Sequence, residues 1–305
     1  MATVAVIMST YNGEKYLREQ LDSIFAQRDV EVTLFVRDDG SMDDTHAILA
    51  EYAQKHTCVF VEFGENVGVG NSFMNALYST PDTFEYYAFA DQDDIWQENK
   101  LSEAVKLLNA SGKLLYASNQ ECVDKDGNTL GLRYKTDAVV HTKPPEIMSN
   151  NMLAGCTMVM NEQLHDILCE KRNRPSGALL RNRIHDVWVA FVAALYNGIV
   201  YDTRSFIRYR QHENNVVGAQ STRKKRRQER RKKIRNAELR NGRSFLAREA
   251  VEKFPVAARY PLLAICADGA TLRGKKKILK HQKELRSYTK EKYVVFLVKV
   301  MFGLF

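Results

Sequence analysis

The sequence lacks the cysteine spacings and nucleophile groupings that mark several common classes of protein. Neither a disulfide framework nor a structural zinc site is predicted, because no Cys-x-x-Cys pair occurs and the total is odd, which fits a reducing cytoplasm. The N-terminus runs directly into a strand-like segment without a basic region and a long apolar core, so we expect no signal peptide. No isolated Ser-His-Asp or Cys-His arrangement stands out as a nucleophile site. The five cysteines are Cys58, Cys122, Cys156, Cys169 and Cys266.

The composition is that of a globular protein with an uneven distribution of charge. The 305 residues are 45% hydrophobic and 27% charged, which is enough for a full core. Residues 1–221 contain 20 Lys and Arg against 30 Asp and Glu, whereas residues 222–305 contain 25 against 7. The sequence therefore predicts an acidic main domain over residues 1–220 and a basic C-terminal region over residues 221–305.

Strand-like and helix-like segments alternate along the first part of the chain. Four apolar, β-branched or aromatic runs are separated by segments with helical spacing, which predicts an α/β fold with a mostly parallel sheet and helices on both faces. The four runs are Thr3–Met8, Val32–Val36, Val59–Phe63 and Tyr86–Ala90. Further strands are expected over residues 114–118, 151–160, 199–201 and 206–209, and basic helices are expected from residue 221.

Three carboxylates follow the apolar run Tyr86–Ala90. A strand buried on both faces cannot keep these charges inside, so they should emerge at its C-terminal end, where open α/β sheets bind ligands. Asp91 and Asp93 lie two residues apart, and on an extended segment they would point the same way and could share one divalent cation. Asp94 should point away from Asp93 and cap the turn into the next helix.

The run Val32–Val36 also ends in acidic residues, Asp38 and Asp39, followed by Gly40 and Ser41. Both acidic strand ends should meet at one edge of the sheet, which favours a single site. Taken alone, residues 38–41 are better explained as an ordinary turn than as a base-binding site. Asn12, after the first strand, is expected to cap the helix that follows.

Four motifs in order resemble the family 2 glycosyltransferases. They are Val6-Ile7-Met8-Ser9-Thr10-Tyr11-Asn12, Asp38-Asp39-Gly40-Ser41, Asp91-Gln92-Asp93-Asp94 and His185-Asp186-Val187-Trp188. The resemblance covers residues 3–215 and implies the GT-A fold, a nucleotide-diphospho-sugar donor and transfer with inversion. The form Asp-Gln-Asp-Asp-Ile-Trp and the later Tyr209-Arg210-Gln211-His212 look most like bacterial rhamnosyltransferases of cell-wall or O-antigen polysaccharide assembly.

The resemblance also implies roles for individual residues. Asp39 would accept a hydrogen bond from the nucleobase, and Asp91 would lie near the ribose and the metal. Asp93 is the expected direct metal ligand, His212 would complete the metal shell, and Asp186 would be the catalytic base. The remaining residues expected to line the nucleotide-sugar site are Thr10, Tyr11, Asp38, Asn66, Gln92, Arg208 and Arg210.

Several of these roles have an alternative. Asp186 could be only the N-cap of the helix that carries Trp188, and His212 could be an ordinary loop histidine. Asn71 stands where several relatives place a basic residue near the diphosphate, so Arg208 or Arg210 would have to supply that charge.

The expected chemistry uses a divalent metal and one carboxylate base. Mn²⁺ or Mg²⁺ suits carboxylate, phosphate and imidazole ligands, and it would stabilise the charge that develops on the leaving diphosphate. The favoured donor is dTDP-rhamnose and the acceptor a glycan or lipid-linked glycan. The alternatives are transfer of another hexose from a UDP-sugar, nucleotidyl transfer, and nucleic-acid binding led by the basic tail. Nucleotidyl transfer would require a basic, glycine-rich loop after the first strand, and residues 9–13 contain no basic residue.

The C-terminal region carries a dense basic run at 223–235 and ends in the apolar segment Tyr293–Phe305. That segment is too short to span a bilayer but suits its interface. We therefore expect a peripheral protein at the cytoplasmic face of an anionic membrane rather than a nucleic-acid binder. The alternative is that the tail packs on the main domain or forms a homodimer.

Overall fold

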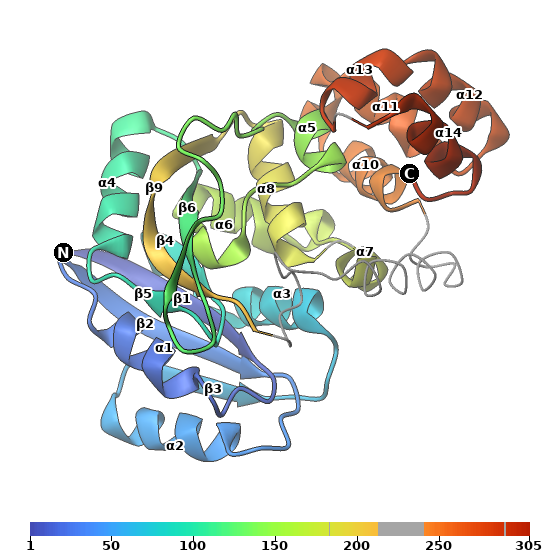
Figure 1. The fold of residues 1–305 in the computed structure, drawn as a ribbon. Helices are drawn as coiled ribbons and strands as arrows, with labels where there is room; N and C mark the ends of the chain where they lie inside the picture. Colours follow the sequence, from blue (N-terminus) through green and yellow to red (C-terminus); the bar gives the residue numbers. More distant parts are fainter. Residues whose placement is uncertain (183, 213–240, 290) are drawn as a thin grey trace. The chain divides into compact units, whose positions relative to one another are not determined.

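The computed structural model describes residues 1–182, 184–212, 241–289 and 291–305, and these residues form two compact units (Figure 1). The first unit contains Met1–Val140, Leu153–Cys169 and the described part of 198–218. The second contains His141–Met152, Glu170–Asn197 and the described part of 219–305. The expected boundary at residue 220 lies outside the described residues. Two segments expected in the main domain, 141–152 and 170–197, group with the C-terminal helices.

The first unit is built on one mixed sheet. Its strand order is β3-β2-β1-β4-β8-β6-β9-β5, and β7 pairs with β6. Strands β1 to β4 are mutually parallel, β6 is parallel to β9, and β5, β7 and β8 run antiparallel to their neighbours. The strands are β1 (Ala2–Thr10), β2 (Val30–Asp38), β3 (Val59–Phe63), β4 (Tyr86–Ala90), β5 (Ile95–Trp96), β6 (Leu115–Val123), β7 (Thr129–Leu132), β8 (Val159–Asn161) and β9 (Ile199–Arg210).

Helices cover both faces of this sheet, and the residues of the central strands are therefore buried on either side. Val4, Val6 and Met8 of β1 share one core with the apolar residues of α1, α2 and α4. On the other face, Phe73 of α3 meets the Phe89 ring edge-on at 5.6 Å between centroids. The predicted α/β fold is confirmed. The helices of this unit are α1 (Leu17–Phe25), α2 (Thr45–Lys55), α3 (Val69–Ser79), α4 (Lys100–Ser111) and α6 (Glu162–Cys169).

Two local predictions differ from the structure. The strand expected over residues 151–160 is only β8, because a 3-10 turn at Gly155–Thr157, closed by the Thr157 N–H donating to the Ala154 carbonyl, precedes it. The short strands expected at 199–201 and 206–209 are one strand, β9, which pairs with β6 through two register shifts.

The described residues of the second unit form helices, as was expected for the basic C-terminal region. Trp188 of α8 packs against Phe254, with ring centroids 5.9 Å apart. None of the helices in the described part of the chain has the length and apolar character that crossing a membrane requires. The α-helices among the described residues of this unit are α5 (Pro144–Ser149), α7 (Gly177–Asn182), α8 (His185–Leu195), α10 (Gly242–Lys253), α11 (Pro261–Ala267), α12 (Leu272–Lys280), α13 (Gln282–Ser287) and α14 (Tyr293–Met301).

Candidate active site

The loops after β1, β2 and β4 meet at one edge of the first unit's sheet. Thr10 pairs with Asp38 across β1 and β2, and Met8 pairs with Ala90 across β1 and β4. Because these strands are parallel, the segments that follow each of them leave the sheet at the same edge. The predicted convergence of the two acidic strand ends is therefore present in the structure.

Asp38 organises the loop after β2 from the inside. Its buried carboxylate accepts hydrogen bonds from the Thr10 hydroxyl at 2.8 Å, from the Ser41 backbone N–H at 2.8 Å and from the Gly40 N–H at 3.1 Å. Burial alone would raise the pKa of Asp38, but the hydrogen bonds, led by those from Ser41, outweigh burial and hold that pKa below its usual value. Asp38 therefore shapes this loop as an ionised acceptor.

Asp39 links the loop after β2 to the loop after β3. Its carboxylate accepts from the backbone N–H groups of Val67 at 2.9 Å and Gly68 at 3.0 Å, and from the Arg37 guanidinium at 2.6 Å. Arg37 is itself buried and also donates to the Ser72 hydroxyl at 3.0 Å. These hydrogen bonds fix the orientation of the Asp39 carboxylate before any ligand binds.

Tyr11 and Gln92 tie the first loop to the acidic turn after β4. The Gln92 side-chain amide accepts from the Tyr11 N–H at 2.9 Å and donates to the Tyr11 carbonyl at 3.1 Å. A Cβ atom on Gly13 would overlap the end of the Gln92 side chain, so this packing requires glycine there. Tyr11 is 48% exposed and Asn66 is also exposed, so both could contact a ligand.

The Asn12 side chain, in the loop after β1, accepts a hydrogen bond from the backbone of the loop after β2. Asn12 has a φ of 48°, and its side-chain oxygen accepts from the Met42 N–H at 2.8 Å. The expected role of Asn12 as a helix cap is wrong, because α1 begins only at Leu17 with Tyr16 as its N-cap.

Asp93 and His212 form a direct contact although they are 119 residues apart in the chain. The Asp93 Oδ2 and His212 Nε2 atoms are 2.7 Å apart, and each side chain is 16% exposed. The His212 ring also lies 5.2 Å from the Tyr16 ring, between centroids. The structure therefore brings together two of the three residues predicted to hold a metal and leaves both reachable from solvent.

Arg210 fixes the backbone of the acidic turn. Its Nε donates to the Asp93 carbonyl at 3.1 Å and its Nη1 to the Lys125 carbonyl at 3.2 Å, while its guanidinium pairs with Glu19 and lies 4.5 Å from the Tyr16 ring centroid. The Arg210 side chain is only 4% exposed. These contacts make it a support for Asp93. Its predicted role as countercharge to a diphosphate stays a prediction.

Arg208 is the more accessible of the two arginines predicted at the diphosphate. Its side chain is 37% exposed, its Nη2 donates to the Gly127 carbonyl, and its Nε lies 3.9 Å from the Glu121 carboxylate. The diphosphate role of Arg208 also stays a prediction.

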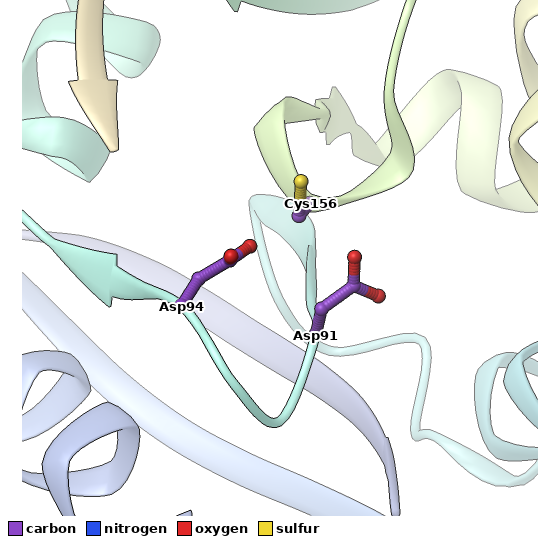
Figure 2. Close-up of side chains that lie close together, drawn as sticks. All are labelled: Asp91, Asp94 and Cys156. Atoms are coloured by element: carbon purple, nitrogen blue, oxygen red, sulfur yellow. The ribbon is translucent and has the colours of Figure 1, made fainter. Parts of the chain in front are cut away.

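A second cluster consists of Asp91 and Asp94, at the two ends of the turn, together with Cys156 (Figure 2). One potential ligand atom from each of these residues lies within 4.8 Å of the others. Asp94 is fully buried and its Oδ1 accepts from the Arg210 backbone N–H at 3.1 Å. The expectation that Asp94 caps the turn into the next helix is wrong, because α4 has Asn99 as its N-cap.

The two clusters differ in how well their side chains suit Mn²⁺ or Mg²⁺. Burial, together with the charges of its acidic neighbours, raises the pKa of Asp94 well above its usual value, and burial also raises the pKa of the Cys156 thiol. A ligand must lose its proton to bind a metal, which a raised pKa opposes, and cysteine sulfur is too soft a donor for Mn²⁺ or Mg²⁺. Two atoms bound at right angles to one such ion are about 3 Å apart, close to the Asp93–His212 separation of 2.7 Å. Asp93 and His212 therefore fit the metal that the resemblance implies, whereas the buried Asp94 and Cys156 do not.

Asp186 lies in the first turn of α8, in the second unit. Its Oδ1 accepts from the Val187 N–H at 2.6 Å, and the N-cap of the helix is Ile184, so the alternative of Asp186 as N-cap is wrong. The predicted role of Asp186 as the catalytic base is a separate question and stays a prediction.

Sequence reasoning missed the residues that support the site. The contact of Arg37 with Asp39 could have been predicted, because strand alternation places side chains two residues apart on the same face of the sheet. Tyr16 and Glu19 carry no local pattern, because their partners Arg210 and His212 lie almost 200 residues away.

Comparison with known proteins identifies a family and several relatives of this chain. The family described as "Glycosyl transferase family 2" matches residues 5–168. The chain is 29% identical over 233 residues to the dTDP-rhamnosyl transferase RfbG of Shigella flexneri, covering 70% of this chain and 74% of that protein. It is 25% identical over 217 residues to an uncharacterised glycosyltransferase of Rickettsia typhi, covering 69% of this chain and 64% of that protein.

Among solved structures, the fold resembles residues 1–349 of S. aureus TarS. In the complex with UDP the TM-score is 0.58 at 18% identity, covering 93% of this chain and 73% of the other. In the complex with UDP-GlcNAc it is 0.54 at 16% identity, covering 94% and 81%. Similarity at this identity concerns the fold alone and agrees with the predicted GT-A architecture. With the family match spanning more than half of its length, this chain belongs to the family 2 glycosyltransferases.

Proposed function

We propose that this enzyme transfers L-rhamnose from dTDP-rhamnose to a glycan or lipid-linked glycan acceptor, with inversion at the anomeric carbon. Family membership supports glycosyl transfer, and the similarity to the Shigella dTDP-rhamnosyl transferase supports the donor. The observation that carries the proposal is the Asp93–His212 contact of 2.7 Å. This contact lies on the turn that Gln92 joins to the exposed Tyr11.

The nucleoside would bind along the loops after β1 and β2. The exposed Tyr11 ring offers a stacking surface for the base. Asp39 Oδ2 accepts a hydrogen bond from Gly68 and as a carboxylate oxygen has a second lone pair, which could accept from the imide N–H of thymine. Asp38 and Thr10 would stabilise the loop after β2 that carries Asp39. Asn66 would lie beside the ribose or diphosphate.

The diphosphate end of the donor would bind at the acidic turn. Asp93, His212 and Asp91 would hold Mn²⁺ or Mg²⁺, which when bound supplies positive charge for the developing charge of the leaving group. Arg208 would face the same diphosphate, and Arg210 would act through the Asp93 carbonyl that it holds.

Transfer itself would need one base. The acceptor hydroxyl oxygen forms a bond to the anomeric carbon from the face opposite the phosphate, and the carbon–oxygen bond to dTDP breaks with its electron pair leaving on the phosphate. Asp186 would take the hydroxyl proton on its carboxylate. A single displacement of this kind inverts the anomeric centre and requires no enzyme nucleophile.

The donor is tested by thermal shift followed by turnover. dTDP, UDP and GDP are each added with Mn²⁺, and at about one hundred times its dissociation constant the true ligand should raise the melting temperature by roughly 5 °C. We expect dTDP to do so, and dTDP-rhamnose to release dTDP on incubation. Stabilisation by UDP and not by dTDP would transfer the proposal to a UDP-hexose. No response to any nucleotide would contradict the proposed donor site itself.

A further inference from the structure

Helix α14, in the second unit, is apolar on the side that faces solvent as well as on the side that is buried. Phe296 and Val300 are buried, and Phe296 meets the Phe305 ring edge-on at 5.7 Å between centroids. On the other side, Val294 is 67% exposed and Phe302, directly after the helix, is 70% exposed. At about 100° per residue, five apolar side chains fall within a band of about 120° on this outer side. We call this band the apolar stripe: the exposed Val294, Val295, Met301 and Phe302 and the half-buried Val298.

Helix α12, which contacts α14, is basic on its exposed side. Gly274 and Ile278 are buried, whereas the four basic residues that are exposed follow one another at intervals of three, one and three residues, which puts them on one side of the helix. Lys275 ties the two helices together, since its Nζ donates to the Met301 carbonyl at 2.9 Å. The basic stripe consists of Arg273, Lys276, Lys277 and Lys280.

The two stripes together select among the partners that could cover them. Nucleic acid would pair with the basic stripe but would leave Val294 and Phe302 in water. A second copy joined through its own α14 in a two-fold dimer would bring two basic helices close together, which like-charge repulsion opposes. An anionic bilayer satisfies both stripes, because apolar side chains enter the acyl boundary while lysines reach the headgroups.

We infer that the apolar stripe of α14 and the basic stripe of α12 form a docking surface for an anionic lipid bilayer. Helix α14 has nine residues, so at about 1.5 Å per residue it lies in the interface and does not cross. The surface would hold the enzyme where lipid-linked acceptors are found. The inference stands on α12 and α14 and does not depend on the donor, so the binding assay can succeed or fail whatever sugar is transferred.

The test is co-flotation of the full chain with vesicles of phosphatidylcholine, with and without about one third phosphatidylglycerol. We expect binding to the anionic vesicles only, weakened at least about tenfold by Val294→Asp with Phe302→Asp. Lys276→Gln and Lys280→Gln should each weaken binding about fivefold. Val251→Asp is the matched control, because Val251 is exposed at 41% on α10 of the same unit and should leave binding unchanged.

Three results would overturn the inference. The first is a wild-type chain that does not float with anionic vesicles. The second is stripe variants that keep their circular dichroism and float as well as the wild type. The third is full loss of binding when only the basic residues of the run 223–227 are changed to Gln, since that run would then be the membrane element. A wild-type dimer that the apolar-stripe variant dissociates, without flotation of either, would identify a second copy as the partner.

Discussion

Replacing Arg210 by Met tests whether Arg210 stabilises the acidic turn that carries Asp93. The Arg210 side chain donates to two backbone carbonyls, Asp93 and Lys125, and pairs with Glu19 while only 4% exposed. Methionine fills much of the same space but cannot donate a hydrogen bond. The turn that carries Asp93 would therefore lose its fixed connection to α1.

The expected cost in free energy of unfolding is about 3 kcal/mol. Each carbonyl that loses its donor costs about 1 kcal/mol or more. Loss of the ion pair with Glu19 adds about 1 kcal/mol to this cost. The cost is small because Glu19 is 54% exposed and its carboxylate can be hydrated, whereas a fully buried partner would cost more. For a chain of this size the melting temperature should fall by roughly 6 °C.

Calorimetry measures that change, and Mn²⁺ titration well below the transition measures the effect on the site. Because Arg210 holds the Asp93 carbonyl, Arg210→Met should weaken Mn²⁺ binding by about tenfold or more. Arg204→Gln is the control, since Arg204 forms ion pairs but its side chain is 57% exposed, and it should cost less than about 1 kcal/mol. An Arg210→Met variant that melts within a degree of the wild type and binds Mn²⁺ equally well would contradict a supporting role for Arg210.

Three further changes test other parts of the structure. Gly13→Ala should cost about 1–2 kcal/mol by displacing Gln92 from the Tyr11 backbone, and almost nothing in a Gln92→Ala background, as a double-mutant cycle of denaturant unfolding would show. Asp186→Asn should keep dTDP binding by calorimetry but lose turnover of dTDP-rhamnose by at least about a hundredfold, and wild-type turnover would exclude Asp186 as the base. Burial lowers the pKa of Lys100 to about 7, so between pH 7 and the ordinary lysine pKa the unfolded chain binds the extra proton and stability should rise with pH. Lys100→Met should therefore stabilise most below pH 7 and progressively less towards pH 10, and an unchanged pH profile of unfolding would contradict this.

The parts of the fold and site that depend on local pattern were predictable. The apolar runs that end in acidic residues located β2 and β4, and the alternation of strands and helices predicted where their ends would meet. The roles of the three carboxylates after β4 were less predictable, because strand alternation does not continue beyond Ala90. The chain turns there, so Asp94 enters the core and Asp93 meets His212.

Contacts between distant segments could not be derived from spacing. Arg210 reaches Glu19 across 191 residues, and no local feature of either residue indicates the other. The basic stripe on α12 and the apolar stripe on α14 are each visible as periodic patterns. Their adjacency is visible only through contacts such as Lys275 with the Met301 carbonyl.

We propose that Asp93 and His212 hold the metal of a nucleotide-sugar site, and calorimetric titration of dTDP tests this proposal most directly. The wild type should bind dTDP in Mn²⁺ at least about tenfold more tightly than in EDTA, and Asp93→Asn should remove that difference. Equal dTDP affinity with and without Mn²⁺, or an Asp93→Asn variant that keeps the full metal effect, would contradict the account.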